Sequence, residues 1–458
     1  ARARLAGQVL RERLQGLGPV RVDLIGVTSV LGDDASTWLD APATDLDGNP
    51  RVFSCAIDMG AYESQSNLIV GGTIASDTTW SSDTVYVHCD VNISDTVTLT
   101  IDPGVVVMFS GHYAINVQGR LLAIGTMLDP IRFTIYDTTG FGDSTHVGWN
   151  GIQFVGTPPT NDSSIIDHAI IEFSKRVADD FGGGILVDNF SKLRVSNSLI
   201  QYNFASYGGG IAVTNSSSPL IRNNTIQMNF AHRNCLPCGY SGYGGGIAVY
   251  YGSNPRILGN RIINNKSYNL GGGLDIYTSS PVVANNLIAG NSNHGWGGGV
   301  RIWYFSDPVF SNNTVTANHA GFYGGGYSIF NGCNPVITNE IIYGNTSGLG
   351  NPQLDTVANS TPVITYSNME GLVYPGMGNL DADPLFADPA NGDFHLLPAS
   401  PSINAGRPDT TGLGLPPTDL DGSQRVFSCA IDMGAYETHN KVVGGPITAD
   451  TTWSSDTV

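Results

Sequence analysis

The sequence has few charged side chains, few basic ones in particular, and little cysteine. Charged residues make up 13% of the 458, and 21 Lys and Arg stand against 39 Asp and Glu, which gives a formal net charge of −18. A chain this acidic repels phosphate backbones, so we expect no nucleic-acid partner. Six cysteines are too few for a disulfide scaffold. No apolar run reaches the roughly 18 residues of a membrane-spanning helix, so we expect no membrane span in this segment.

Glycine is abundant instead. It accounts for 58 of the 458 residues, where the average usage of about 7% would give roughly half as many. Hydrophobic residues make up 41%, which argues against a disordered chain. This composition indicates many short strands joined by tight turns.

A twenty-residue motif occurs twice in the chain. Residues 44–63 read TDLDGNPRVFSCAIDMGAYE, and residues 418–437 read TDLDGSQRVFSCAIDMGAYE. The sequence DTTWSSDTV at 77–85 also returns, at 450–458. We interpret the chain as one full unit, about 64–437, of a tandem array, with a piece of each neighbouring unit attached. A recent duplication of the single motif is the alternative.

A shorter repeat lies within this unit. The sequence GGG followed by an apolar–x–apolar strand begins at Gly182, Gly208, Gly244, Gly271, Gly297 and Gly324, in steps of 26, 36, 27, 26 and 27 residues. The long step contains an insertion at 232–243. Each repeat also carries a Pro and then two Asn, the first in the series Asn224, Asn260, Asn286, Asn313 and Asn339, the second in the series Asn229, Asn265, Asn291, Asn318 and Asn345.

These patterns predict an all-β fold, a right-handed parallel β-helix solenoid with three short strands per coil and about 26 residues per coil. Inward positions alternate along each strand, as in Ile247/Val249 and Leu274/Ile276. Successive coils should stack about 4.8 Å apart, which gives roughly eleven coils and a length of about 50 Å. Asn at fixed turn positions should form ladders of side-chain amides from coil to coil.

The repeating GGGI-V…P-I-NN-I--N coils resemble right-handed parallel β-helix repeat proteins of the pectin-lyase-like group. Upstream, TLTIDPGVVVMF (98–109) and GRLLAIGTMLDPIRFT (119–134) are similar to the opening coils of secreted bacterial members. Downstream, DPLFADPANGDFHLLPASPSINAG (383–406) with IDMGAYE is similar to the end of choice-of-anchor Q proteins. The resemblance implies a secreted, surface-associated protein, in a group that includes lyases, hydrolases and adhesins.

The repeats divide the chain into six segments. Residues 1–43 match neither end of the unit and are either an amphipathic helix or sequence outside the natural reading frame; we favour the second, because an array should place a copy of 383–417 here. Then follow the C-terminal motif of the preceding unit (44–63), an N-terminal cap with the first coils (64–180), the regular coils (181–382), a C-terminal cap region (383–437) and the start of the next unit (438–458).

The first strand of each coil should show two columns of side chains to solvent. One is Leu186, Ala212, Ala248, Asp275, Arg301 and Ser328, and the other is Asp188, Thr214, Tyr250, Tyr277, Trp303 and Phe330. A third column precedes each GGG, at Phe181, Tyr207, Tyr243, Leu270, Trp296 and Tyr323. Aromatic rings in such columns either contact the faces of sugars or stabilise the sheet by stacking on each other. The predicted substrate-binding residues are Tyr250, Asp275, Tyr277, Trp296, Arg301, Trp303, Tyr323 and Phe330.

Chemistry at this surface has one candidate. A metal-free β-eliminating lyase could use Tyr277 and His294 as base and acid, with Arg301 neutralising a uronate carboxylate. The alternative is a surface ion pair between Asp275 and Arg301, which would contribute under about 1 kcal/mol. The clustered carboxylates of a calcium-dependent lyase or a glycoside hydrolase are missing from these columns.

Metal sites are weakly indicated. Asp179, Asp180 and Asp188 could hold Ca²⁺, although a solvated turn is favoured, so no cofactor is required and Ca²⁺ is optional. On the inserted loop, His232, Cys235 and Cys238 offer three possible metal ligands, and a local disulfide is favoured. DLDG at 45–48 and 419–422 lacks the later ligands of a calcium loop and predicts an Asx-turn.

These observations predict an extracellular or cell-surface protein that binds polysaccharide, as an adhesin or matrix component. Its partners would be an extracellular polysaccharide and the neighbouring β-helix units of the same chain. A polysaccharide lyase and a purely structural spacer are the alternatives.

Overall fold

The computed structural model of the protein describes Leu46 and residues 69–141, 148–176, 180–232, 242–371, 373–407, 409–426 and 430–438. Three of the predicted segments, 1–43, all of 44–63 except Leu46, and 438–458 beyond its first residue, therefore lie outside the described residues. Among the residues described, no helix is long and apolar enough to cross a membrane.

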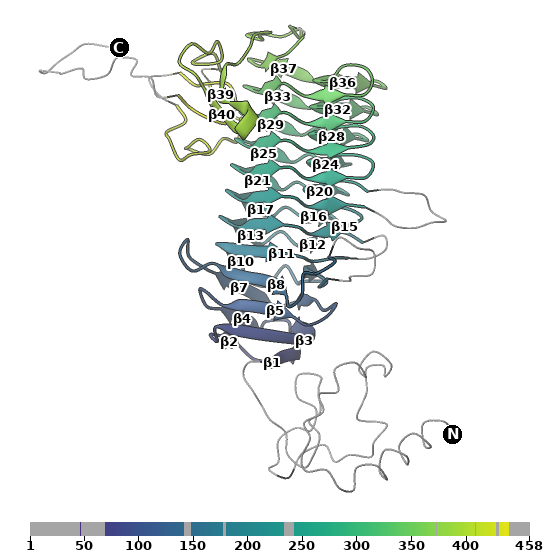
Figure 1. Ribbon diagram of the computed structural model, residues 1–458, viewed down its shortest axis with the longest axis vertical. Helices are drawn as coiled ribbons and strands as arrows, with labels where there is room; N and C mark the ends of the chain where they lie inside the picture. The colour runs from purple at the N-terminus through teal and green to yellow at the C-terminus, as the bar shows by residue number, and fades with distance from the viewer. Residues whose placement is uncertain are drawn as a thin grey trace, which may run out of the picture. The chain divides into compact units, whose positions relative to one another are not determined.

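The described chain winds into a right-handed parallel β-helix, which confirms the predicted fold class (Figure 1). Its first sheet contains β6 (Ile115–Val117), β9 (Ile152–Val155), β12 (Ile185–Asp188), β16 (Ile211–Thr214), β20 (Ile247–Tyr250), β24 (Leu274–Tyr277), β28 (Val300–Trp303), β32 (Tyr327–Phe330) and β36 (Leu354–Val357). The second sheet has eleven strands: β2 (Thr78–Trp80), β4 (Thr98–Ile101), β7 (Arg120–Ile124), β10 (Ser164–Asp167), β13 (Leu193–Ser196), β17 (Leu220–Arg222), β21 (Arg256–Leu258), β25 (Val282–Ala284), β29 (Val309–Ser311), β33 (Val336–Thr338) and β37 (Val363–Thr365). The eleven strands agree with the expected number of coils.

The third sheet contains β5 (Val106–Phe109), β8 (Ile131–Ile135), β11 (Ala169–Glu172), β14 (Leu199–Gln201), β18 (Thr225–Gln227), β22 (Arg261–Ile263), β26 (Leu287–Ala289), β30 (Thr314–Thr316), β34 (Ile341–Tyr343) and β38 (Asn368–Met369). At the N-terminal end, β1 (Ile69–Ile74) pairs with the long strand β3 (Thr84–Ile93), which pairs in turn with both β5 and β6 and so joins the first and third sheets. Each regular coil also has a fourth strand of two residues, which the sequence pattern does not reveal: β15 (Phe204–Ala205), β19 (Phe230–Ala231), β23 (Lys266–Ser267), β27 (Ser292–Asn293), β31 (His319–Ala320) and β35 (Thr346–Ser347).

The hydrophobic core fills the inside of the solenoid. Each strand contributes alternate residues to it, so that like side chains stack coil upon coil, as Val249 does on Ile276 and Ile276 on Ile302. These inward side chains are completely buried. The period-2 pattern of the sequence therefore predicts the core correctly, because in a parallel stack in register it decides which side chains point inward.

Two ladders of asparagine side chains run along the solenoid, each at one corner of the coils. In the second series, Asn291 Nδ2 donates to Asn318 Oδ1 (3.0 Å) and to Ile262 O (2.8 Å), and the ladder runs from Asn203 to Gln353. A further ladder, which the sequence analysis missed, lies at the corner between the first two sheets, where each backbone N–H donates to the side chain of the next coil: Ser217, Ser253, Ser279, Ser306, Cys333 and Ser360.

The first asparagine series was predicted one residue out of register at its end. Glu340, and not Asn339, accepts hydrogen bonds from the backbone and side chain of Asn313. Asn339 lies beside the ladder, where its backbone is left-handed (φ 59°) and its Nδ2 donates to Asn312 Oδ1 (3.0 Å). Two adjacent side chains fit the spacing, and only the pairing with Asn313 distinguishes them.

The C-terminal region does not close the end of the solenoid as the predicted cap would. Residues 373–380 cover the last coil, where Asn379 Nδ2 donates to Ile364 O (2.9 Å) and Ser367 N donates to Asn379 Oδ1 (3.0 Å). Residues 383–437 instead run back along the outside of the third sheet (Figure 1). They include the antiparallel pair β39 (Phe386–Asp388) and β40 (Asp393–Leu396), joined by the short 3-10 helix η2 (Pro389–Asn391).

We expect Glu340→Gln to flatten part of the dependence of stability on pH. Burial raises the pKa of Glu340 to about 8, from an ordinary value of 4.5. Between these values the folded protein holds a proton that the unfolded chain has released, so the free energy of unfolding falls as pH rises from about 4.5 to about 8. The variant should match the wild type at pH 5 and exceed it by roughly 2–4 kcal/mol at pH 9, measured by urea unfolding.

The matched control is Glu370→Gln, the same substitution at a partly exposed carboxylate, and the Glu340→Gln profile is compared with the profile of this variant. A Glu340→Gln profile that runs parallel to that of the wild type would show that another group causes the pH dependence.

Candidate functional site

Glycine triplets fold the chain tightly around the start of the six first-sheet strands from β12 to β32. At Gly271 the backbone is left-handed (φ 60°), and a Cβ there would lie 2.7 Å from the Cβ of Asp275. A Cβ on Gly272 would lie 2.3 Å from the carbonyl oxygen of Gly298 in the next coil. The triplet therefore brings the residue before it, Leu270 in this coil, over the outer face of the first sheet.

The first predicted solvent column is buried, because this fold-back covers it. Leu186, Ala212 and Ala248 form a small hydrophobic cluster outside the first sheet, with the rings of Phe181, Tyr207 and Tyr243 packed over it. Those rings stack from coil to coil, with centroids 4.4 Å apart for Phe181–Tyr207 and 5.1 Å for Tyr207–Tyr243. Strand alternation alone could not predict this second layer, since it depends on where the chain goes after each turn.

Asp275 and Arg301 form a buried ion pair in the same column, and not the surface pair considered above. Their side chains are 0% and 1% exposed, and Arg301 Nη2 donates to Asp275 Oδ2 at 2.8 Å while Nε donates to Oδ1. Tyr250 also donates its hydroxyl to Asp275. The guanidinium lies 5.2 Å from the ring centroid of Tyr243 and 4.7 Å from that of Trp303.

The ionisation of this cluster is fixed by its burial and its charges. Burial and the charge of Asp275 raise the pKa of Tyr250 well above its ordinary value. Burial acts against the charge of Arg301, but Asp275 and Tyr250 outweigh it, so the pKa of Arg301 is raised. Arg301 is thus a permanent cation whose charge is already matched by Asp275, although its Nη1 has no hydrogen-bond partner among the residues that the structure describes.

The three residues of the hypothetical lyase site are not gathered at one point. Tyr277 and Trp303 are opposite each other at the C-terminal ends of β24 and β28. His294 precedes the other end of β28, is exposed, and places Nδ1 3.0 Å from Tyr268 O. A strand of this kind advances about 10 Å over three residues, so His294 and Tyr277 lie near opposite ends of the first-sheet strands. Arg301 between them is buried in its ion pair.

Aromatic residues form a partly exposed ridge at the end of the first sheet, with Tyr251, Tyr304 and Phe305 exposed and the others half-buried. The aromatic ridge consists of Tyr251, Tyr277, Trp303, Tyr304, Phe305 and Phe330. Its rings contact one another, with centroids 5.0 Å apart for Tyr277–Trp303, 5.7 Å for Trp303–Phe330 and 5.3 Å for Tyr304–Phe305. Of the other predicted binding residues, Trp296 and Tyr323 pair at the opposite edge of the sheet.

Three residues of the ridge were missed by the sequence analysis. Tyr251, Tyr304 and Phe305 are 48%, 43% and 71% exposed, and their backbones are left-handed, with φ of 54°, 65° and 52°. The doublet Tyr304–Phe305 occupies the turn where the next coil carries Asn331–Gly332. A search of that turn for residues unsuited to positive φ could have found them.

Two of the three predicted calcium ligands are described. Asp188 accepts a hydrogen bond from Asn215 (2.7 Å), Asp180 lies 3.7 Å from the guanidinium of Arg176, and Asp179 lies outside the described residues. In the parts of the chain that the structure describes, no three His, Cys, Asp or Glu side chains could hold a metal ion together.

The two other motifs considered for metal binding are the His and Cys residues of the inserted loop and the two DLDG sequences. Cys235 and Cys238 lie outside the described residues, and the ring of His232 lies 5.0 Å from that of Tyr268. The Asx-turn at 419–422 is confirmed, because Asp419 Oδ1 accepts from the backbone of Asp421 (3.0 Å) and of Ser423 (2.7 Å). Its counterpart at 45–48 is not described beyond Leu46.

The protein is a right-handed parallel β-helix repeat protein. Two overlapping matches, at residues 159–297 and 243–368, are to the family model described as "Right handed beta helix region". The solved structure titled "Crystal structure of pectate lyase Pel9A" is similar at 13% sequence identity and a TM-score of 0.37, over 73% of this chain and 88% of that chain. No curated protein matches the sequence.

The buried pair gives a prediction about stability. Arg301→Met would leave Asp275 buried without its cation and should lower the free energy of unfolding by about 3–5 kcal/mol. The double variant Asp275→Leu/Arg301→Met replaces the pair with apolar side chains of the kind present at Leu186, and should recover most of that loss. Urea unfolding of the two single variants and the double variant measures this coupling. Losses that simply add would mean that the two charges do not depend on each other.

Proposed function

We propose that this is a secreted or cell-surface β-helix repeat protein that binds extracellular polysaccharide through the aromatic ridge, as an adhesin or matrix component. The observation that carries the proposal is the presence of bulky aromatic residues in left-handed backbone at an exposed turn. This conformation costs about 1–2 kcal/mol per residue. The next coil makes the same turn with Asn331–Gly332, and the coil of β16 makes it with Asn215–Ser216, residues that tolerate it better.

Strain of this kind is retained where the side chain has another use. Tyr304 and Phe305 add little to the core, since they are 43% and 71% exposed. Flat rings with open faces suit the apolar faces of pyranose sugars. The ridge therefore offers a stacking surface along several coils, which fits a long polymer better than a small molecule.

Polar groups that could bond sugar hydroxyls lie three residues further along each coil. Here exposed side chains bond to the backbone of the next coil: Asn254 accepts from Ser280 N (2.7 Å), Ser280 from Asp307 N (3.0 Å) and Asp307 from Asn334 N (2.7 Å). This row is held in a fixed geometry by the stacking of coils. Arg301 is buried with Asp275, so it is a poor candidate to neutralise an acidic sugar.

The extracellular location rests on separate support. Cys89 is disulfide-bonded, and disulfides persist in oxidising compartments. The similarity of 383–406 to the ends of choice-of-anchor Q proteins points the same way. A calcium requirement is not part of the proposal.

The test is glycan binding by the 458-residue chain and by a variant that carries the turn of the next coil, Tyr304→Asn/Phe305→Gly. We expect glycan-array binding to fall about tenfold or more, because two stacking rings are lost. The free energy of unfolding should stay the same or rise, by up to about 2 kcal/mol, because the backbone strain is relieved. Trp303→Ala should weaken binding as well.

The matched control is Phe322→Asn, an exposed ring that contacts Trp296 away from the ridge, and it should leave binding intact. A destabilised Tyr304→Asn/Phe305→Gly variant with unchanged binding would make the ridge a structural ladder instead. An absorbance rise at 235 nm on uronate polymers would make the protein a lyase, and absence of both binding and turnover would favour a spacer.

A further inference from the structure

The repeated motif forms a clasp on the flank of the solenoid. We call residues 418–438 the clasp, and we call the outer side of β22, β26, β30 and β34, with the turns beside it, the flank. Ala435 and Tyr436 are buried against Leu287 and Ala289 of the flank. In Figure 1 the same C-terminal region lies beside β25 and β29, where Ser311 Oγ donates to Leu413 O (2.6 Å).

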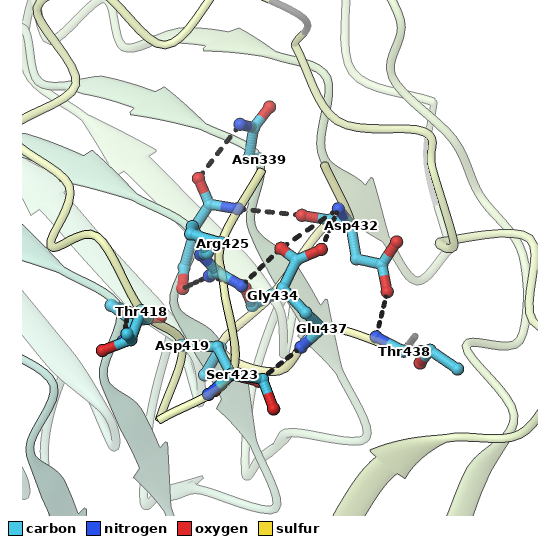
Figure 2. Close-up of polar contacts among 12 residues, drawn as sticks. Asn339, Thr418, Asp419, Ser423, Arg425, Asp432, Gly434, Glu437 and Thr438 are labelled. Carbon is cyan, nitrogen blue, oxygen red and sulfur yellow. Dashed lines mark hydrogen bonds and ion pairs between the residues drawn. The ribbon is translucent and has the colours of Figure 1, made fainter. Parts of the chain in front are cut away.

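The clasp is held together from inside by Arg425. Its Nη1 donates to Glu437 Oε1 (2.7 Å) and its Nη2 to the carbonyl oxygen of Gly434, so it ties the two halves of the motif to each other (Figure 2). Asp432 caps the next turn by accepting from Thr438 N (2.7 Å). Arg425 and Glu437 are both almost completely buried, so the motif is built around this pair.

Backbone groups of the clasp bond directly to the flank. Gly434 N donates to Asn339 O (2.7 Å), Ala435 N donates to Thr314 Oγ1 (2.9 Å), and Asp432 O accepts from Asn312 Nδ2 (2.8 Å). Gly434 has a φ of 89°, and a Cβ on it would lie 2.7 Å from both Ile341 and Thr314. The close approach therefore requires glycine at this position.

The side chains of the clasp extend the contact toward the N-terminal coils. Tyr436 OH accepts from Arg261 Nη1 (2.7 Å), and Asp421 accepts from Arg261 Nη2 (3.0 Å). His395 bonds to Asp421 and its ring contacts that of Tyr436, with ring centroids 4.2 Å apart and the planes tilted by 41°.

The copy of the motif at 44–63 keeps the groups that the clasp itself supplies, whereas His395 lies outside the motif and has no counterpart there. Asp47, Arg51, Gly60, Tyr62 and Glu63 stand where the clasp has Asp421, Arg425, Gly434, Tyr436 and Glu437. The two positions that differ correspond to Ser423 and Gln424, whose side-chain and backbone bonds described here remain within the clasp. The flank would therefore meet the same surface in either copy.

We propose that residues 44–63 bind the flank of a second β-helix unit in the way that 418–437 bind the flank of their own. The described residues form one flank, and the sequence contains two copies of the motif that binds a flank. The occupant is a second copy of this chain, or an identical unit. In the wild type the attached clasp holds the flank, because a short tether gives it an effective concentration of about millimolar. Once the attached clasp is released from the flank, residues 44–63 of another copy take its place.

The experiment disables each copy in the full chain. Gly434→Val should release the attached clasp by steric clash at Ile341, and the flank should then take up residues 44–63 of another copy. We expect light scattering after size exclusion to show monomeric wild type and Gly60→Val, and dimers or larger oligomers of Gly434→Val over a concentration series. The double variant Gly60→Val/Gly434→Val should be monomeric.

A fluorescent peptide of residues 44–63 gives a second readout. It should bind Gly434→Val and bind the wild type at least about tenfold more weakly, and a peptide with Gly60→Val should bind neither. The milder pair Tyr436→Ala and Tyr62→Ala repeats the test if valine at 434 disturbs folding. A monomeric Gly434→Val that does not bind the peptide would overturn the proposal, as would equal association of the single and double variants.

Discussion

Backbone hydrogen bonding between successive coils is the constraint on which the rest of the structure depends. Each strand bonds only to the coils on either side, as Ile247 N does to Gly273 O (2.9 Å) and Leu274 N to Gly299 O (2.9 Å). The stack therefore continues only if every coil returns to the same position. The 36-residue step obeys this rule, because Ala231 and Gly242 accept bonds from Tyr268 and Leu270 of the next coil, so the coil pairs in register on both sides of the insertion.

The glycine triplets follow from the same constraint and add a second layer to the first sheet. Tight turns at the triplets keep the coil short, and they also turn the preceding residue over the outer face of the sheet. That face then holds apolar residues in the early coils and a compensated charge pair, Asp275 with Arg301, in the later ones. The surface left open to a ligand lies beyond this layer, at the turn that carries Tyr304 and Phe305.

The sequence predicts those features that repeat at short range. Inward Ile and Val positions, the two asparagine ladders and the parallel stacking all recur through the regular coils, so spacing alone reveals them. The sequence predicts less well where neighbours in space are distant in the chain. At the end of the first asparagine series the spacing fits both Asn339 and Glu340, and only the hydrogen bonds of Asn313 show that Glu340 belongs to the ladder. Arg301 was predicted on the surface because the rings that cover it come from other coils. The flank was not foreseen, although the outward residues change from Thr225 and Gln227 to Leu287 and Ala289.

The direction of the clasp has a mechanical consequence. The chain completes its last coil and then runs back toward earlier coils, so that Tyr436 meets Arg261, 175 residues away. A force applied to the chain beyond the clasp is therefore transmitted first to the middle of the solenoid through contacts loaded in shear. The terminal coil at β37 and β38 is bypassed while the clasp holds. A parallel stack opens most readily from its ends, and here the C-terminal end, covered by residues 373–380, lies outside the path of the load.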